Sequence, residues 1–174
     1  MTLKLSTTVC DKGKQNMENE AVSAEVMRLA RARAMKILEY ADRTEKQLRD
    51  RLKEGEFPPF AIDAAVAYVK EMHYLDDRRY AEIYIRSKTG QKSRYEMTNE
   101  LRMRGVDEDS IHEALCSEEP DDTETVRRLF LKKYASKDLS DPGVYQKAFR
   151  YFGGKGFSYE SIREGIRRGI EEES

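Results

Sequence analysis

Residues 105–115 read GVDEDSIHEAL, and residues 156–166 read GFSYESIREGI. The two stretches share glycine, serine, isoleucine and glutamate at the same places, and their apolar positions coincide. A more diverged copy, FPPFAIDAAV, occupies residues 57–66, with its glycine displaced to Gly55. A segment that recurs at a regular interval is the signature of a repeat architecture.

The corresponding isoleucines of the three copies are Ile62, Ile111 and Ile162, which lie 49 and 51 residues apart. A glycine, an apolar residue and then a capping residue indicate the end of one helix and the start of the next. Asp107 and Ser158 have side chains typical of N-caps, and two prolines take their place in the first copy. We expect the isoleucines and the apolar residues one turn later to face a core.

A second signal recurs at the same interval. Thr44 and Ser93 lie 49 residues apart, and each precedes a glutamine or glutamate by three residues, which is the form of a capping box. The third copy has Asp141 followed by proline at this place. A helix therefore begins at the same point of each repeat.

Each repeat opens with a further helix, which we expect over residues 25–40, 77–87 and 122–134. Their inward stripes are Ala34, Leu38 and Ala41; Tyr80, Ile83 and Tyr84; and Val126, Leu129, Phe130 and Tyr134. The sequence thus predicts an all-α fold of three tandem three-helix repeats, forming an elongated, curved right-handed or solenoid-like array.

The repeats divide the chain into a poorly structured leader over residues 1–22 and three-helix repeats over 23–76, 77–120 and 121–174. A lone unit of about fifty residues is near the lower limit for a stable core. We therefore expect neighbouring repeats to stabilise one another by stacking.

Composition excludes several classes of protein. Charged residues make up 37% of the 174 residues, and no apolar run approaches the length of a membrane span. The two cysteines form no CxxC pair and there are only two histidines, so we expect no metal site, no cofactor and a reducing cytoplasm. The sequence contains no phosphate-binding, zinc-protease or nucleophile-elbow motif, and the glycines at 153–156 fall at a helix break. We interpret the protein as a non-enzyme.

The net charge of −1 conceals strong segregation. Residues 78–105 carry eight basic and three acidic side chains, whereas residues 106–125 carry nine acidic side chains and no basic one. Such blocks are either solvated helix faces or binding surfaces for charged partners.

Residues 74–88, YLDDRRYAEIYIRSK, closely resemble the central signature of the RecX family of bacterial regulatory proteins. Residues 100–107, ELRMRGVD, resemble that family's next block, and RTEKQLRDRL at 43–52 and GFSYESI at 156–162 fit as well. The resemblance spans about residues 30–168. Glu56 departs from it, because the other repeats have glycine there.

The resemblance implies a modulator, mainly an inhibitor, of the RecA recombinase in DNA repair, recombination and the SOS response. Such a protein binds the RecA filament on single-stranded DNA in its helical groove, blocks filament extension and lowers ATPase, strand-exchange and coprotease activities. It could also contact DNA directly, without sequence specificity. We expect a cytoplasmic monomer with no membrane contact. The candidate filament- or DNA-binding residues are Arg78, Arg79, Arg86, Lys88, Lys92, Arg94, Arg102, Arg104, Arg127, Arg128, Lys132 and Lys133.

Two alternatives remain open at this point. Short helices joined by glycine turns are also typical of sequence-specific DNA-binding proteins. Helical repeats serve equally as protein-only adaptors, which would bind a partner with little dependence on salt.

Overall fold

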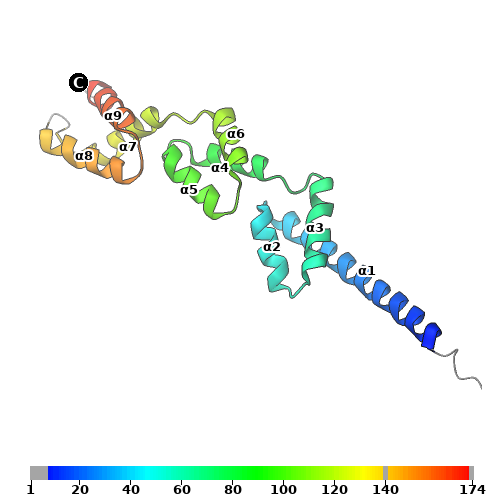
Figure 1. The fold of residues 1–174 in the computed structure, drawn as a ribbon. Coiled ribbons are helices and arrows are strands. Elements are labelled where there is room, and N and C mark those ends of the chain that lie inside the picture. Colours follow the sequence, from blue (N-terminus) through cyan, green and yellow to red (C-terminus); the bar gives the residue numbers. More distant parts are fainter. Residues whose placement is uncertain (1–7, 139–140, 173–174) are drawn as a thin grey trace, which may run out of the picture. The chain divides into compact units, whose positions relative to one another are not determined.

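The computed structural model describes the backbone of residues 8–138 and 141–172, and side chains from Met17 onward. All regular secondary structure in these residues is helical, which confirms the predicted all-α tandem-repeat fold (Figure 1). The helices are α1 (Thr8–Tyr40), α2 (Glu45–Glu54), α3 (Pro59–Glu71), α4 (Asp77–Lys88), α5 (Arg94–Met103), α6 (Glu108–Glu118), α7 (Asp122–Tyr134), α8 (Pro142–Gly154) and α9 (Tyr159–Glu172). They form two units, Met1–Asp76 and Asp77–Ser174.

The first unit contains α1, α2 and α3, with α1 packed along α3. Thr44 begins α2 with the predicted capping box: its hydroxyl accepts a hydrogen bond from the Gln47 N–H, and the Gln47 side chain accepts one from the Thr44 N–H. These two bonds satisfy backbone donors that the first helical turn leaves free. The largest fully buried side chains of this unit are Leu48, Leu52 and Val69.

The leader differs from our expectation. Helix α1 begins at Thr8 and is 33 residues long, so residues 8–22 are helical where we predicted little structure, and residues 1–7 lie outside the described part of the chain. The segment lacks glycine or proline after Gly13, and the core contacts of Ala30 and Ala34 nucleate a helix that extends upstream. Despite this length, none of the described helices is apolar enough to cross a membrane.

The second unit contains two further three-helix groups, each with its own buried cluster. Helix α4 packs on α6, and α7 packs on α9. Met97, Leu101 and Ile111 are buried in the first group, and Phe130 and Ile162 in the second. As predicted, all three repeat isoleucines are buried, with Ile62 in the first unit.

The predicted inward stripe of α4 needs one correction. Ile83 is 44% exposed, whereas Ala81 and Ile85 are fully buried. Ala81 and Ile85, which are one helical turn apart, therefore mark the side of α4 that faces the core, because α6 packs on that side.

The turn between the second and third helices has the same geometry in all three repeats. The N–H groups of Phe57, Val106 and Phe157 donate to the carbonyl oxygens five residues earlier, at 3.3, 3.1 and 3.2 Å. This bond belongs to the Schellman motif, which requires a left-handed residue just before the donor. Gly105 and Gly156 supply it with φ of 85° and 80°.

The first repeat builds this turn without glycine. Glu56 occupies the left-handed position with φ of 59°, while Gly55, the displaced glycine, has φ of −82°. A side chain with a Cβ is strained in this conformation. The departure of Glu56 from the repeat pattern therefore changes the strain of the turn and leaves its geometry intact.

Polar contacts join the two groups of the second unit. The Ser93 hydroxyl donates to the Lys155 carbonyl oxygen at 2.7 Å, and the Arg94 Nε donates to the Pro120 carbonyl oxygen at 2.9 Å. The Arg94 backbone N–H donates to the Asp122 carboxylate at 3.0 Å. Burial raises the pKa of Asp122 even though this hydrogen bond acts in the opposite direction. The N-terminus of α5 is thus the hydrogen-bonded joint between the second and third repeats.

Candidate partner-binding surface

Two of the predicted arginines on α4 are tied to α6. Arg78 contacts Glu82 on its own helix at 3.2 Å and Glu113 on α6 at 2.6 Å. Arg86 donates two hydrogen bonds to the Glu118 carboxylate, at 3.0 and 2.6 Å, and this contact lowers the pKa of Glu118. Arg86 nevertheless keeps 71% of its side chain exposed. The basic second repeat and the acidic 106–125 segment therefore neutralise one another across a helix pair.

The basic residues of α5 and the loop before it are paired in the same way. Arg102 donates to both carboxylate oxygens of Glu108, at 2.5 and 2.8 Å. Lys92 contacts Glu100 and, at 3.4 Å, Glu96. The segregated charge seen in the sequence thus becomes an interleaved surface in the fold.

Arg104 supports the packing of the second repeat. Its guanidinium donates to the Tyr80 hydroxyl at 2.8 Å and lies 4.3 Å from the centre of the Tyr84 ring. Tyr84 is buried, so this cation–π contact covers the edge of the core. Arg94 has the role in the joint described above. Both arginines thus stabilise the fold of the second unit.

The predicted cations of the third repeat differ in the kind of contact that each makes. Arg127 donates to both oxygens of the Glu124 carboxylate and also pairs with Glu172. Arg128 lies against Gly90, where its Nη1 would be 2.6 Å from an added Cβ. The Lys133 ammonium lies 4.3 Å from the centre of the Tyr151 ring.

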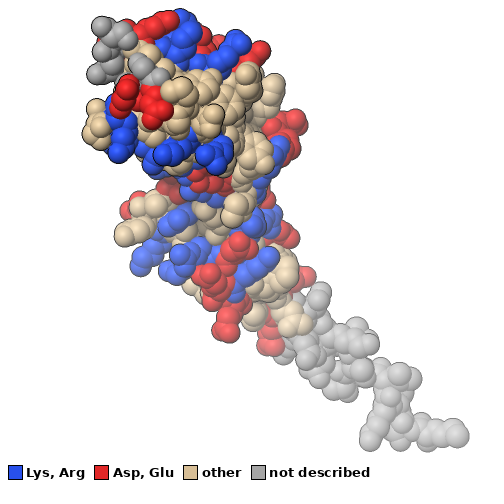
Figure 2. Space-filling model, turned by 90° about the vertical axis from the view of Figure 1, so that its left-hand side faces the viewer, with Lys and Arg blue, Asp and Glu red and all other residues tan. Residues whose placement is uncertain are grey.

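The twelve predicted residues do not form one free basic patch. Figure 2 shows basic and acidic side chains interleaved over the face in view. Arg79 is exposed on α4. The side-chain ammonium groups of Lys88 and Lys132 have neither a hydrogen bond nor an ion pair with another described residue. An anionic partner must therefore either bind such unpaired lysines or exchange with the carboxylates that hold the arginines.

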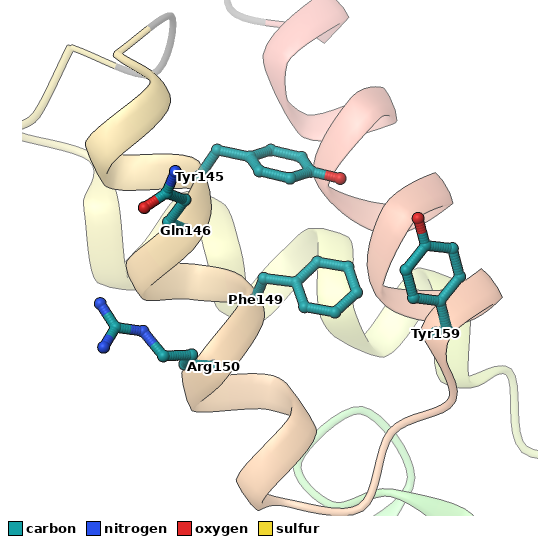
Figure 3. A pocket seen from close by; sticks show the side chains of 5 residues that line it. All are labelled: Tyr145, Gln146, Phe149, Arg150 and Tyr159. Atoms are coloured by element: carbon teal, nitrogen blue, oxygen red, sulfur yellow. The ribbon is translucent and has the colours of Figure 1, made fainter.

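A surface that the predictions missed lies on α8. Residues 142–159 contain no aspartate or glutamate, and they include three lysine or arginine residues and six aromatic residues. Tyr145, Phe149 and Tyr159 line a hollow of about 390 Å³ together with Gln146 and Arg150 (Figure 3). A charge count over a helix-length window finds this segment, whereas the counts over residues 78–105 and 106–125 do not reach it.

Fold and surface together define a class: an all-helical protein built from tandem three-helix repeats, with ion-paired cations over its surface. In the part of the chain that the structure describes, no group of histidine, cysteine, aspartate and glutamate could hold a metal ion. Its repeats match the first, second and third three-helix domains of RecX, over residues 30–68, 76–115 and 120–166. The chain belongs to the RecX family.

Curated relatives agree with this assignment. Regulatory protein RecX of Clostridium perfringens (strain 13 / Type A) is 32% identical over 139 residues, which are 78% of this chain and 66% of that protein. Regulatory protein RecX of Bacillus subtilis (strain 168) is 33% identical over 134 residues, which are 75% of this chain and 51% of that protein. The chain thus aligns with between about half and two thirds of the length of these relatives.

Solved structures share the fold. The crystal structure of RecX from Lactobacillus salivarius superposes with a TM-score of 0.73, covering 84% of this chain and 97% of that one at 23% identity. A second crystal structure of regulatory protein RecX superposes with a TM-score of 0.70 at 24% identity. The tandem three-helix architecture is therefore common to all three chains.

Proposed function

We propose that this protein inhibits the RecA recombinase by binding the RecA filament on single-stranded DNA in its helical groove. Occupancy of the groove blocks filament extension and lowers ATPase, strand-exchange and coprotease activities, with no chemistry performed by the protein itself. The observation that carries this proposal is the match of three successive RecX domains along the chain. The cellular setting we propose is DNA repair, recombination and the SOS response in the cytoplasm, with the protein acting as a monomer.

The end of α4 is the part of the second repeat best suited to a charged filament surface. Arg86 is highly exposed although it is paired with Glu118, and Lys88 beside it has no such partner among the described residues. A surface ion pair contributes only about 0–1 kcal/mol. An acidic group on the filament can therefore displace Glu118 from Arg86 at little cost, and Lys88, which lies on another face of the same helix end, can contact a second acidic group.

The test measures DNA-stimulated ATP hydrolysis by RecA during titration with this protein, at low and at moderate salt. We expect the rate to fall, and to fall less at the higher salt because charged contacts are screened. An unchanged rate at several-fold molar excess over RecA would refute the proposed inhibition.

Reversal of two charges locates the contact. Arg86→Glu with Lys88→Glu should weaken inhibition by an order of magnitude or more, because two attractions become repulsions. The matched control is Arg51→Glu with Lys53→Glu, which reverses two cations at the same spacing in the last turn of α2. Equal loss of inhibition in both variants would show that net charge, and not the end of α4, determines filament binding.

A further inference from the structure

The acid-free segment at residues 142–159 is unusual in this chain. Elsewhere the chain carries 33 aspartate and glutamate residues, and at least nine of its eighteen arginines form ion pairs with them. Three of the six phenylalanines and three of the ten tyrosines lie in the same eighteen residues. Aromatic rings and uncompensated positive charge are therefore concentrated together on α8 and the start of α9.

Three aromatic rings form the wall of the hollow. Tyr145 and Phe149 extend from one side of α8 toward α9, where Tyr159 extends beside them (Figure 3). The centres of the Tyr145 and Phe149 rings are 6.0 Å apart, and those of Phe149 and Tyr159 are 5.1 Å apart. Tyr159 is 65% exposed, so one face of this ring cluster is open to solvent.

Cations border the hollow without being neutralised. Arg150 lines it, Lys147 is exposed on the next face of α8, and Arg163 is exposed one turn after Tyr159 on α9. None of their three side chains has an ion pair or hydrogen bond with another residue whose side chain is described. These unpaired cations contrast with the ion-paired arginines of the second repeat, such as Arg86 and Arg102.

The acidic groups nearest in sequence do not cancel this charge. Asp141 precedes the segment, and its carboxylate accepts a hydrogen bond from the Gly143 N–H at the start of α8. Glu160 is exposed beside Tyr159. Two carboxylates thus accompany the three cations, and the segment around the hollow keeps a net positive charge.

A second ring on the solvent side of α8 repeats the combination. Tyr151 lies 4.3 Å from the Lys133 ammonium and 5.7 Å from the Lys155 ammonium, measured to the ring centre. Tyr151 and Lys147 are one turn apart on the same face of the helix. The aromatic and basic character therefore continues across α8 from the hollow.

We propose that this surface of the third repeat binds single-stranded nucleic acid directly. An unpaired base stacks on the open face formed by Tyr159 and Tyr145, and the phosphates on either side contact Arg150 and Lys147. Stacked aromatic rings beside a positive groove are the features that bind single strands without sequence preference. A duplex keeps its base faces stacked inside the helix and cannot use the hollow in this way.

The binding of bases distinguishes this occupant from an acidic protein segment. The hollow presents aromatic faces from three different residues, and only a planar ligand gains stacking from them. An acidic peptide without aromatic side chains would gain no such stacking. The inference concerns the free chain and does not rest on the proposed inhibition of RecA.

The experiment measures fluorescence anisotropy of a labelled oligothymidylate with the full chain and no RecA present. Tyr159→Ala should weaken binding by about five- to a hundredfold, the range that stacking of one base contributes. Tyr159→Phe keeps the ring and should retain binding. Arg150→Glu should weaken binding and make it less dependent on salt, because a phosphate contact is lost.

Controls match each change outside the surface. Tyr74→Ala removes a tyrosine that is 58% exposed in the first unit, and Lys53→Glu reverses one charge on α2. Both should bind as the wild-type chain does. Circular dichroism of every variant establishes that it is folded.

Several results would overturn the proposal: no binding of the oligonucleotide, unchanged affinity of Tyr159→Ala, or equal affinity for a duplex of the same length. Competition by polyglutamate as effective as that by unlabelled oligothymidylate would assign the surface to acidic protein segments instead. The Arg86→Glu, Lys88→Glu variant should keep oligonucleotide binding while it loses inhibition of RecA. The two proposals can therefore fail separately.

Discussion

Replacing Gly165 with alanine sets two effects of opposite sign against each other. In an unconstrained helix interior, alanine is favoured over glycine by about 1 kcal/mol, because glycine loses more backbone freedom on folding. Gly165 is buried in α9 where this helix packs on α7. An added Cβ would lie 2.7 Å from the Thr123 carbonyl oxygen and 2.7 Å from the Val126 Cβ. Neither atom belongs to the end of a flexible side chain that could rotate away.

The packing effect should therefore prevail. Helices α7 and α9 must move apart to admit the methyl group, and overpacking of this kind costs about 1–3 kcal/mol. The shift also loosens the contacts that Val126 and Phe130 make with α9. Because the atoms in the way cannot rotate aside, we expect a cost in the upper part of this range, about 2–3 kcal/mol. After the gain of about 1 kcal/mol in helix propensity is subtracted, Gly165→Ala should lower the free energy of unfolding by about 1–2 kcal/mol.

A matched control lies in the neighbouring helix. Gly153 of α8 has no atom within 4 Å of the position that a Cβ would take, so Gly153→Ala should stabilise the protein by about 0.5–1 kcal/mol. Urea unfolding followed by circular dichroism measures the free energy of unfolding of both variants. A shift of the unfolding midpoint without a change in the m-value reports the change in stability. If Gly165→Ala were as stable as the wild-type chain or more stable, the close approach of α7 and α9 would be refuted.

Two further predictions concern single side chains. Glu56→Gly should raise the melting temperature, because the left-handed conformation costs a non-glycine residue about 1–2 kcal/mol. Glycine avoids this strain but loses more backbone entropy on folding, which costs about 0.5–1 kcal/mol. An unchanged or lower melting temperature would contradict the strain assigned to this turn. Burial raises the pKa of Asp122, so at this residue the folded chain retains a proton that the unfolded chain has released. The contribution of Asp122 to stability therefore falls as the pH rises from about 4 through its folded-state pKa. Asp122→Asn keeps an acceptor for the Arg94 N–H and cannot ionise. The stability of this variant relative to the wild-type chain, measured by urea titration, should therefore increase over this pH range. A stability difference independent of pH would show that Asp122 is not desolvated.

The helix boundaries were largely predictable because they depend on neighbouring residues. Thr44, Ser93 and Asp107 cap the helices that follow them, as the spacing of polar residues indicated. The predicted start and end of the helix over residues 122–134 agree with α7. The leader was not predictable in this way, because residues 8–22 extend a helix whose stability arises downstream.

The free and the paired cations could not be told apart before the fold was known. Arg86 and Glu118 are 32 residues apart, and Arg78 and Glu113 are 35 residues apart. Their contact depends on how α4 packs against α6, which also turned Ile83 outward. The aromatic surface on α8 was visible only as composition, since the hollow requires Tyr159 to come from the next helix.

The amino-acid sequence by itself determined the family and the threefold repeat of helices, because both are recognised from the order of residues along the chain. It also determined the caps and turns between helices, because these rest on interactions between residues that are close in the sequence. The tertiary structure alone decided which charges are neutralised, which glycine must remain glycine and where aromatic rings gather. Those properties depend on distances between helices, and such distances are set by the packing of side chains that are far apart in the sequence.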